Sequence, residues 1–88
     1  MSSQEEFDAA VERVQRLSKR PSDGELLELY GLFKQATVGD VQGKRPGVMS
    51  FRDRAKWDAW KACEGTSAED ARAAYVALVE RLETKAGA

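Results

Sequence analysis

Apolar residues recur at intervals of three and four positions over long stretches of this 88-residue chain, and no stretch alternates apolar with polar residues. That interval is the period of an α-helix with one buried face, whereas a half-buried strand has a period of two. Two stripes display it most clearly, namely Phe7, Ala10, Val11, Val14 and Leu17 near the start and Ala71, Ala74, Tyr75, Leu78 and Leu82 near the end. The sequence therefore predicts an all-α fold.

Punctuating residues divide the chain into four predicted helices. Pro21 ends the first, because a residue that precedes proline avoids helical geometry, and Gly39 and Gly65 suit the ends of the second and third. Helix starts are expected where a hydroxyl residue stands three positions before an acidic one. These pairs are Ser22–Glu25 (with Asp23 as an alternative cap), Ser50–Asp53 and Thr66–Glu69. The second to fourth helices are accordingly predicted over about 23–38, 51–64 and 66–85, the fourth after its cap.

The charge is unevenly distributed, although the net charge is only −1. Residues 34–61 carry seven Lys or Arg against three Asp or Glu, and acidic residues predominate on both sides of this segment. A nucleic-acid-binding domain is expected to be strongly basic as a whole, so no nucleic-acid partner is expected. A basic centre in a nearly neutral domain instead suits one compact anion, although a solvated charged surface would have the same composition.

Composition also limits the catalytic, metal and membrane-spanning features that this chain can have. The chain has no histidine and a single cysteine, Cys63, which we expect to pack as a small hydrophobe. Histidine triads, histidine- or cysteine-rich metal sites and internal disulfides are disfavoured, so we expect neither an enzyme nor a metal site. No run approaches the ~18 apolar residues of a membrane span, and residues 1–17 lack the apolar segment of a signal peptide. These features predict one cytoplasmic domain over residues 1–88, without stable membrane insertion.

Tyr30, Phe33 and Lys34 form the first candidate binding patch, because residues at i, i+3 and i+4 share one face of a helix. Two rings beside an ammonium group suit a nucleotide, whose base can stack on a ring while its phosphate meets the cation. The competing interpretation is that the rings belong to the core and the lysine extends past them. Gly31 costs about 1 kcal/mol relative to alanine inside a helix, which indicates close approach of either a ligand or a neighbouring helix.

A second candidate patch lies on the third predicted helix. Arg52 and Lys56 are four residues apart, so they could hold one phosphate group from two sides. Trp60, one turn beyond Lys56, could form a cation–π contact. The alternative is that the cations form an exposed face and that Trp57 and Trp60 anchor the core, and for the two tryptophans we favour the core.

Several separate blocks of this chain, in order, resemble the acyl-CoA-binding protein family. The most specific block is LYGLFKQATVGD at residues 29–40, preceded by PSDG at 21–24. Further matches are RPG at 45–47, AKWDAW at 55–60 and GTS at 65–67, with Tyr75 after them. Gly24 departs from the family pattern, in which an acidic or amide residue is usual. The resemblance extends over essentially the whole length of the chain.

The resemblance implies a four-helix, up-down-down-up bundle that binds long-chain acyl-CoA esters one to one and needs no cofactor. It implies that Tyr30, Lys34 and Lys56 hold the ribose 3′-phosphate, that Phe33 stacks on adenine and that Tyr75 lines the same site. Further head-group contacts are implied at Gln15, Gly31, Leu32, Gln35 and Arg52. The acyl chain is expected in a groove between helices, near Ala10, Val14, Leu26 and Leu27.

Two departures from the family fall within the implied site. Phe33 stands where tyrosine is frequent, and we expect little loss because stacking needs only the ring. Gln15 stands where many members have a lysine, which removes one charge near the ligand's phosphates. The implied role is that of a monomeric carrier, which delivers acyl-CoA to the enzymes that consume it. The alternative hypothesis is a protein–protein interaction module in which the apolar second helix docks a partner helix.

Overall fold

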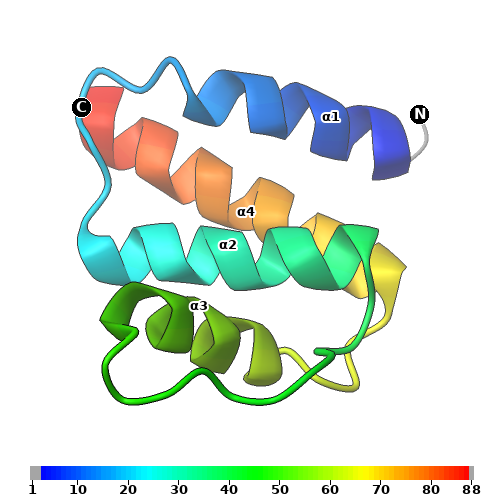
Figure 1. Cartoon of the computed structure of the whole chain (residues 1–88). Coiled ribbons are helices and arrows are strands. Elements are labelled where there is room, and N and C mark those ends of the chain that lie inside the picture. The colour runs from blue at the N-terminus through cyan, green and yellow to red at the C-terminus, as the bar shows by residue number, and fades with distance from the viewer. Residues whose placement is uncertain (1–2, 88) are drawn as a thin grey trace.

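Four α-helices account for most of residues 3–87, the part of the chain that the computed structural model describes. They are α1 (Ser3–Val14), α2 (Asp23–Thr37), α3 (Phe51–Lys61) and α4 (Ala68–Gly87), which confirms the all-α prediction. Figure 1 shows α1 and α4 running in one direction and α2 and α3 in the other, the expected up-down-down-up order. Residues 1, 2 and 88 of the expected domain lie outside the described residues.

The helices lie side by side in the spatial order α1, α4, α2, α3 (Figure 1). The core fills the space among α1, α2 and α4, and α4 contributes the largest share of it. Its buried apolar residues are Phe7, Ala10, Leu29, Tyr75, Leu78, Val79 and Leu82. α3 packs on the outer side of α2. Within residues 3–87, no helix combines the length and the apolar character needed to cross a bilayer.

Two helices end earlier than the apolar pattern predicts. α1 ends at Val14 because the next amides bond three residues back, Gln15 to Glu12 at 3.2 Å, and this tightens the helix end. Leu17 therefore packs against the core from a turn rather than from the helix. α3 ends at Lys61 rather than near residue 64, since short-range turn bonds also follow it.

The predicted helix starts are correct at α2 and differ at the other two helices. Ser22 and Glu25 form the complete capping box. Ser50 precedes α3 but its side chain makes no capping hydrogen bond. At α4 the cap lies one residue later than predicted, because the Ser67 hydroxyl, rather than Thr66, accepts from the Asp70 amide at 3.0 Å.

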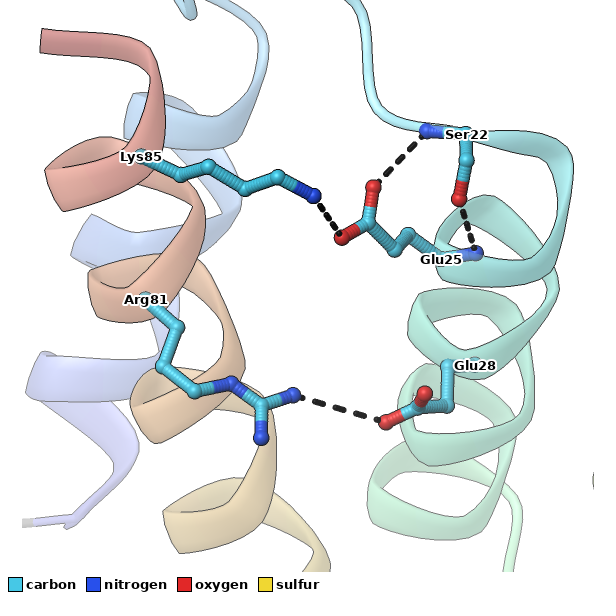
Figure 2. Close-up of polar contacts among 5 residues, drawn as sticks. All are labelled: Ser22, Glu25, Glu28, Arg81 and Lys85. Carbon is cyan, nitrogen blue, oxygen red and sulfur yellow. Dashed lines mark hydrogen bonds and ion pairs between the residues drawn. The ribbon is translucent and has the colours of Figure 1, made fainter.

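The α2 cap is also joined to α4 by ion pairs, as Figure 2 shows. One carboxylate oxygen of Glu25 accepts from the Ser22 amide at 2.8 Å, and the other lies 3.1 Å from Lys85 Nζ. One turn along, Arg81 and Glu28 form a looser pair at 3.8 Å (Figure 2). The Ser22 amide first, and Lys85 second, hold the pKa of Glu25 below its usual value. The start of α2 is therefore fixed against the end of α4.

Side chains of α3 anchor the loop at residues 38–50. The Arg45 guanidinium donates two hydrogen bonds to Asp58, at 2.8 and 2.7 Å. Trp60 Nε1 donates to the Gly39 carbonyl at 2.7 Å. Trp60 is buried, as predicted, whereas Trp57 is only half-buried and is not part of the core. Its Nε1 instead donates a hydrogen bond to the Gln42 carbonyl at 3.3 Å, so Trp57 also helps to anchor the loop.

Candidate functional site

Two lysines reach across the α2–α3 contact, each onto an aromatic ring of the other helix. Lys34 of α2 has its Nζ 4.8 Å from the centre of the Trp60 ring on α3. Lys56 of α3 has its Nζ 5.3 Å from the centre of the Tyr30 ring on α2. Both distances are within the cation–π range of about 6 Å. Trp60 therefore forms a cation–π contact, but with Lys34 rather than with Lys56, its neighbour on α3.

The close approach of the two helices depends on Gly31. A Cβ atom at Gly31 would lie 2.5 Å from the Ala59 carbonyl oxygen and 2.8 Å from its carbon. Of the two explanations that the sequence leaves open for this glycine, the neighbouring helix is the one found. The absence of a side chain at Gly31 brings α3 close enough for Lys34 and Lys56 to reach the opposite rings.

An aromatic cluster joins this pair of helices to α1 and α4. The Phe33 ring stacks on Phe7 of α1, with centroids 5.8 Å apart, and lies 6.4 Å from the Tyr75 ring of α4. Phe33 is 37% exposed, whereas Tyr75 is 5% exposed. Burial raises the pKa of the Tyr75 phenol, so it is a protonated donor at neutral pH. Its hydroxyl hydrogen-bonds to no other residue within 3–87, which leaves this donor available to a ligand.

The cations of the chain separate into paired and unpaired groups. Those within 4 Å of a carboxylate are Arg13, Arg16, Arg20, Arg45, Lys61, Arg81 and Lys85. Within residues 3–87, those without such a carboxylate are Lys19, Lys34, Lys44, Arg52, Arg54, Lys56 and Arg72. Most of the unpaired group lies between residues 34 and 56. Of the seven cations in the basic centre, residues 34–61, five therefore have no carboxylate partner within residues 3–87.

Three residues that the resemblance added to the head-group set face elsewhere. Gly31 lies against α3, as described, and Leu32 packs against the core and lines a groove on another face. Gln35 is 2% exposed, and its Nε2 donates to Asp40 at 2.8 Å and to the Thr66 carbonyl at 2.7 Å. The Nε2 of this buried amide therefore joins two loops, whereas its Oε1 has no hydrogen-bond partner within residues 3–87. These three residues therefore have structural contacts within the protein, and their contact with the head group stays a prediction.

The remaining two head-group candidates are exposed. Arg52 lies on the first turn of α3, one helical turn before Lys56, and has no carboxylate partner among residues 3–87. Gln15 lies in the turn after α1. The cations beside Gln15 are already paired, Arg13 with Glu83 at 3.0 Å and Arg16 with Glu12 of α1 at 3.5 Å. Both cations beside Gln15 are therefore paired with carboxylates of the protein itself.

The residues expected along an acyl-chain groove divide between two sides of α2. Val14 and Leu26 are half-buried and pack together against the core, and Ala10 is fully buried beneath them. Leu27 instead lines a groove of about 530 Å³ formed with α3 and α4. Adjacent helical residues point about 100° apart, so Leu26 and Leu27 face different sides of α2. The structure therefore places Leu27 beside α3 and α4, and its contact with the acyl chain stays a prediction.

The site combines unpaired ammonium groups, an exposed ring face and a phenol donor. Ammonium groups bind phosphate oxygens, and a ring with one open face can stack on a planar base. Phe7 stacks on Phe33, and Trp60 lies under the Lys34 ammonium group; the sequence pattern indicates only a core position for Phe7. Within residues 3–87, no three His, Cys, Asp or Glu side chains gather as metal ligands would.

Known proteins are similar to this chain in both sequence and fold. Residues 4–79 match the family model described as acyl-CoA-binding protein. The chain is 51% identical to acyl-CoA-binding domain-containing protein 3 of Oryza sativa subsp. japonica, covering all of this chain and 57% of that longer protein. It is 50% identical to the acyl-CoA-binding protein of Brassica napus over 93% of this chain and 89% of the relative.

The likeness extends to three dimensions. The crystal structure of Oryza sativa acyl-CoA-binding protein 2 matches 98% of this chain and 96% of its own, with a TM-score of 0.92 and 48% sequence identity. A family model that spans most of the chain and relatives at about half identity agree with the four-helix architecture described above. The chain therefore belongs to the acyl-CoA-binding protein family.

Proposed function

We propose that this protein binds one long-chain acyl-CoA molecule, with the ribose 3′-phosphate held between Lys34 and Lys56. The observation that carries the proposal is the pair of lysines that lie over Trp60 and Tyr30 without a carboxylate partner among the described residues. Rings hold these ammonium groups in position without neutralising them, because a π face attracts a cation but carries no net charge. A phosphate entering between them meets two preorganised cations.

The adenine ring stacks on the exposed face of Phe33 in this proposal. Phe7 covers the other face at a centroid distance of 5.8 Å, so the ring is already fixed before a base arrives. The buried Tyr75 phenol supplies a hydrogen bond near the same ring. Each charge-assisted hydrogen bond to phosphate contributes on the order of 1.5–3 kcal/mol. The head group therefore provides orientation and selectivity.

The acyl chain supplies most of the affinity. It lies along the half-buried apolar surface around Val14 and Leu26, with the core behind it. A buried methylene contributes about 0.8 kcal/mol, so a long chain offers more than the two lysines together, before the cost of ordering the ligand is subtracted. Free coenzyme A is accordingly expected to bind much more weakly than its long-chain esters.

The proposed role is a carrier that acts in the cytoplasm as a monomer and catalyses no reaction. Binding shields the apolar tail from water and delivers the thioester to the enzymes that consume it. The chain offers no histidine for acid–base catalysis. Burial raises the pKa of the Cys63 thiol, which disfavours the thiolate that a nucleophilic mechanism needs.

A charge-removing variant tests the phosphate assignment. Lys34→Met keeps the length and apolar character of the side chain but removes the ammonium group. We expect affinity for an acyl-CoA ester to fall by about tenfold or more, and affinity for the matching 3′-dephospho ester to change little. Lys19→Met is the control, because Lys19 is likewise unpaired among residues 3–87 but lies in the α1–α2 loop. Equal losses on both esters would place Lys34 away from the 3′-phosphate.

A further inference from the structure

The most exposed of the large apolar side chains described here gather where the long loop meets α3. Val48 is 63% exposed, Met49 is 86% exposed and Phe51 is 77% exposed. Val48 and Met49 form the centre of a tight turn, which closes through a 3.0 Å hydrogen bond from the Ser50 amide to the Gly47 carbonyl. Phe51 is the first residue of α3. We refer to Val48, Met49 and Phe51 as the apolar tip.

Neither turn geometry nor core packing explains why apolar residues stand at this turn. Turn centres are dominated by Gly, Pro, Asn, Asp and Ser, which either adopt turn geometry easily or hydrogen-bond to the local backbone. Val48 and Met49 do neither, and their exposed side chains contribute little to the core. An exposed apolar cluster of this kind marks a surface that contacts another apolar phase.

Basic residues flank the apolar tip along the chain. Residues 44–56 contain five Lys or Arg and a single carboxylate, Asp53. Arg45 is neutralised by Asp58, but Lys44, Arg52 and Arg54 form no ion pair within residues 3–87. Whatever covers the tip must therefore present both an apolar interior and a negatively charged rim.

We propose that the apolar tip docks reversibly on the surface of a bilayer that contains anionic lipids. A bilayer interface has the required two layers, because apolar side chains reach the acyl boundary while cations remain among the phosphate groups. A soluble anion would leave Met49 and Phe51 in water, and an uncharged apolar partner would leave the cations unpaired. The three side chains of the tip suffice for peripheral attachment rather than insertion. This inference does not depend on the acyl-CoA site.

Sedimentation of the ligand-free protein with lipid vesicles tests the proposal. We expect binding to vesicles of phosphatidylcholine mixed with phosphatidylserine, and much weaker binding to phosphatidylcholine alone. The double variant Val48→Ser, Met49→Ser places favoured turn residues in the turn, so the fold is retained. Its partition coefficient should fall by about tenfold or more, because two apolar side chains no longer leave water. Val38→Ser is the matched control, since Val38 is 46% exposed but lies at the end of α2.

The contribution of the cations to vesicle binding is measured with the double variant Lys44→Gln, Arg54→Gln. The single variant Lys19→Gln is the control. The double variant should bind anionic vesicles about tenfold more weakly, because each cation near an anionic surface adds to the free energy of binding. The Lys19→Gln variant should bind as the native protein does. Raising the salt from about 0.1 M to about 1 M should release the protein, because screening shortens the Debye length to about 3 Å. Inorganic phosphate at matched ionic strength should release no more than other salts.

Acyl-CoA affinity is measured on the same variants, so that the two functions can fail separately. Unchanged acyl-CoA affinity together with lost vesicle binding supports the proposal. The proposal is overturned if the native protein does not bind anionic vesicles, or if the Val48→Ser, Met49→Ser variant binds them as well as the native protein does. Loss of acyl-CoA affinity without loss of vesicle binding also overturns it, because the tip would then cover the ligand's tail.

Discussion

Replacing Gly31 with alanine should separate α3 from α2. The new Cβ atom would lie 2.5 Å from the Ala59 carbonyl oxygen and 2.8 Å from its carbon, and both are backbone atoms that cannot rotate away. Carbon atoms pack at about 3.5–4.0 Å, so α3 must move by roughly 1 Å. Overpacking of this kind costs about 1–3 kcal/mol. The better helix propensity of alanine returns about 1 kcal/mol, which leaves a net loss of up to about 2 kcal/mol.

Gly24→Ala is the matched control in the same helix. The nearest atom to a Cβ at Gly24 is the Ser22 hydroxyl oxygen at 4.0 Å, which is an ordinary contact. This variant should gain about 0.4–1 kcal/mol, because alanine reduces the conformational freedom of the unfolded chain. Urea unfolding followed by far-UV circular dichroism measures both variants. In a domain of this size each kcal/mol corresponds to roughly 4–8 °C in Tm, so thermal unfolding should place the two variants on opposite sides of the native protein.

The same pair of variants tests whether the α2–α3 contact positions the proposed phosphate site. Lys34 and Lys56 each reach a ring on the opposite helix, so a shift of α3 disturbs both contacts. Acyl-CoA affinity should fall in Gly31→Ala and remain unchanged in Gly24→Ala. If Gly31→Ala proves as stable as Gly24→Ala and binds acyl-CoA equally well, the reasoning from close helix approach is refuted.

Three further expectations concern charge and burial. The pKa of Glu25 is held below its usual value, first by the Ser22 amide, so its contribution to stability is present above pH 4.5 and is lost as the pH falls through the folded pKa. The stability difference between the native protein and Glu25→Gln should therefore shrink in urea titrations below pH 4.5, and a constant difference would contradict this. A double-mutant cycle on Arg45 and Asp58 should give a coupling of about 0.2–1 kcal/mol, because both side chains are nearly half exposed; zero coupling would show that the pair does not hold the loop. Burial raises the pKa of the Cys63 thiol, so iodoacetamide should alkylate it more slowly in the native protein than in urea, and equal rates would argue against that burial.

Local sequence signals were sufficient to locate the four helices of residues 3–87, whereas their up-down-down-up arrangement was implied by the family resemblance. The Ser22–Glu25 capping box needs only residues three positions apart, and Gly39 adopts the positive φ of 100° that favours glycine after a helix. The cap of α4 was misplaced by one residue because Thr66 and Ser67 carry similar hydroxyls. Which of them bonds the helix depends on where the preceding turn ends, and no local pattern reports that.

The candidate site was less predictable, because its contacts lie between helices. Residue spacing correctly grouped Tyr30 with Lys34 on one face, but it could not indicate that each would pair with a residue of α3. The same limit applies to Leu26 and Leu27, which are neighbours in the chain but line different sides of α2. The family resemblance assigns Leu26 and Leu27 to the same groove, whereas the packing of the helices determines which side of α2 each residue lines.

Titration calorimetry with coenzyme A and with acyl-CoA esters of increasing chain length tests the central claim most directly. One ligand should bind per chain, and coenzyme A should bind far more weakly than the long-chain esters. Each added methylene should strengthen binding, with an upper limit of about 0.8 kcal/mol set by complete burial, until the apolar surface is covered. Long-chain esters that bind no more tightly than coenzyme A itself would contradict the claim that this protein carries fatty acyl chains.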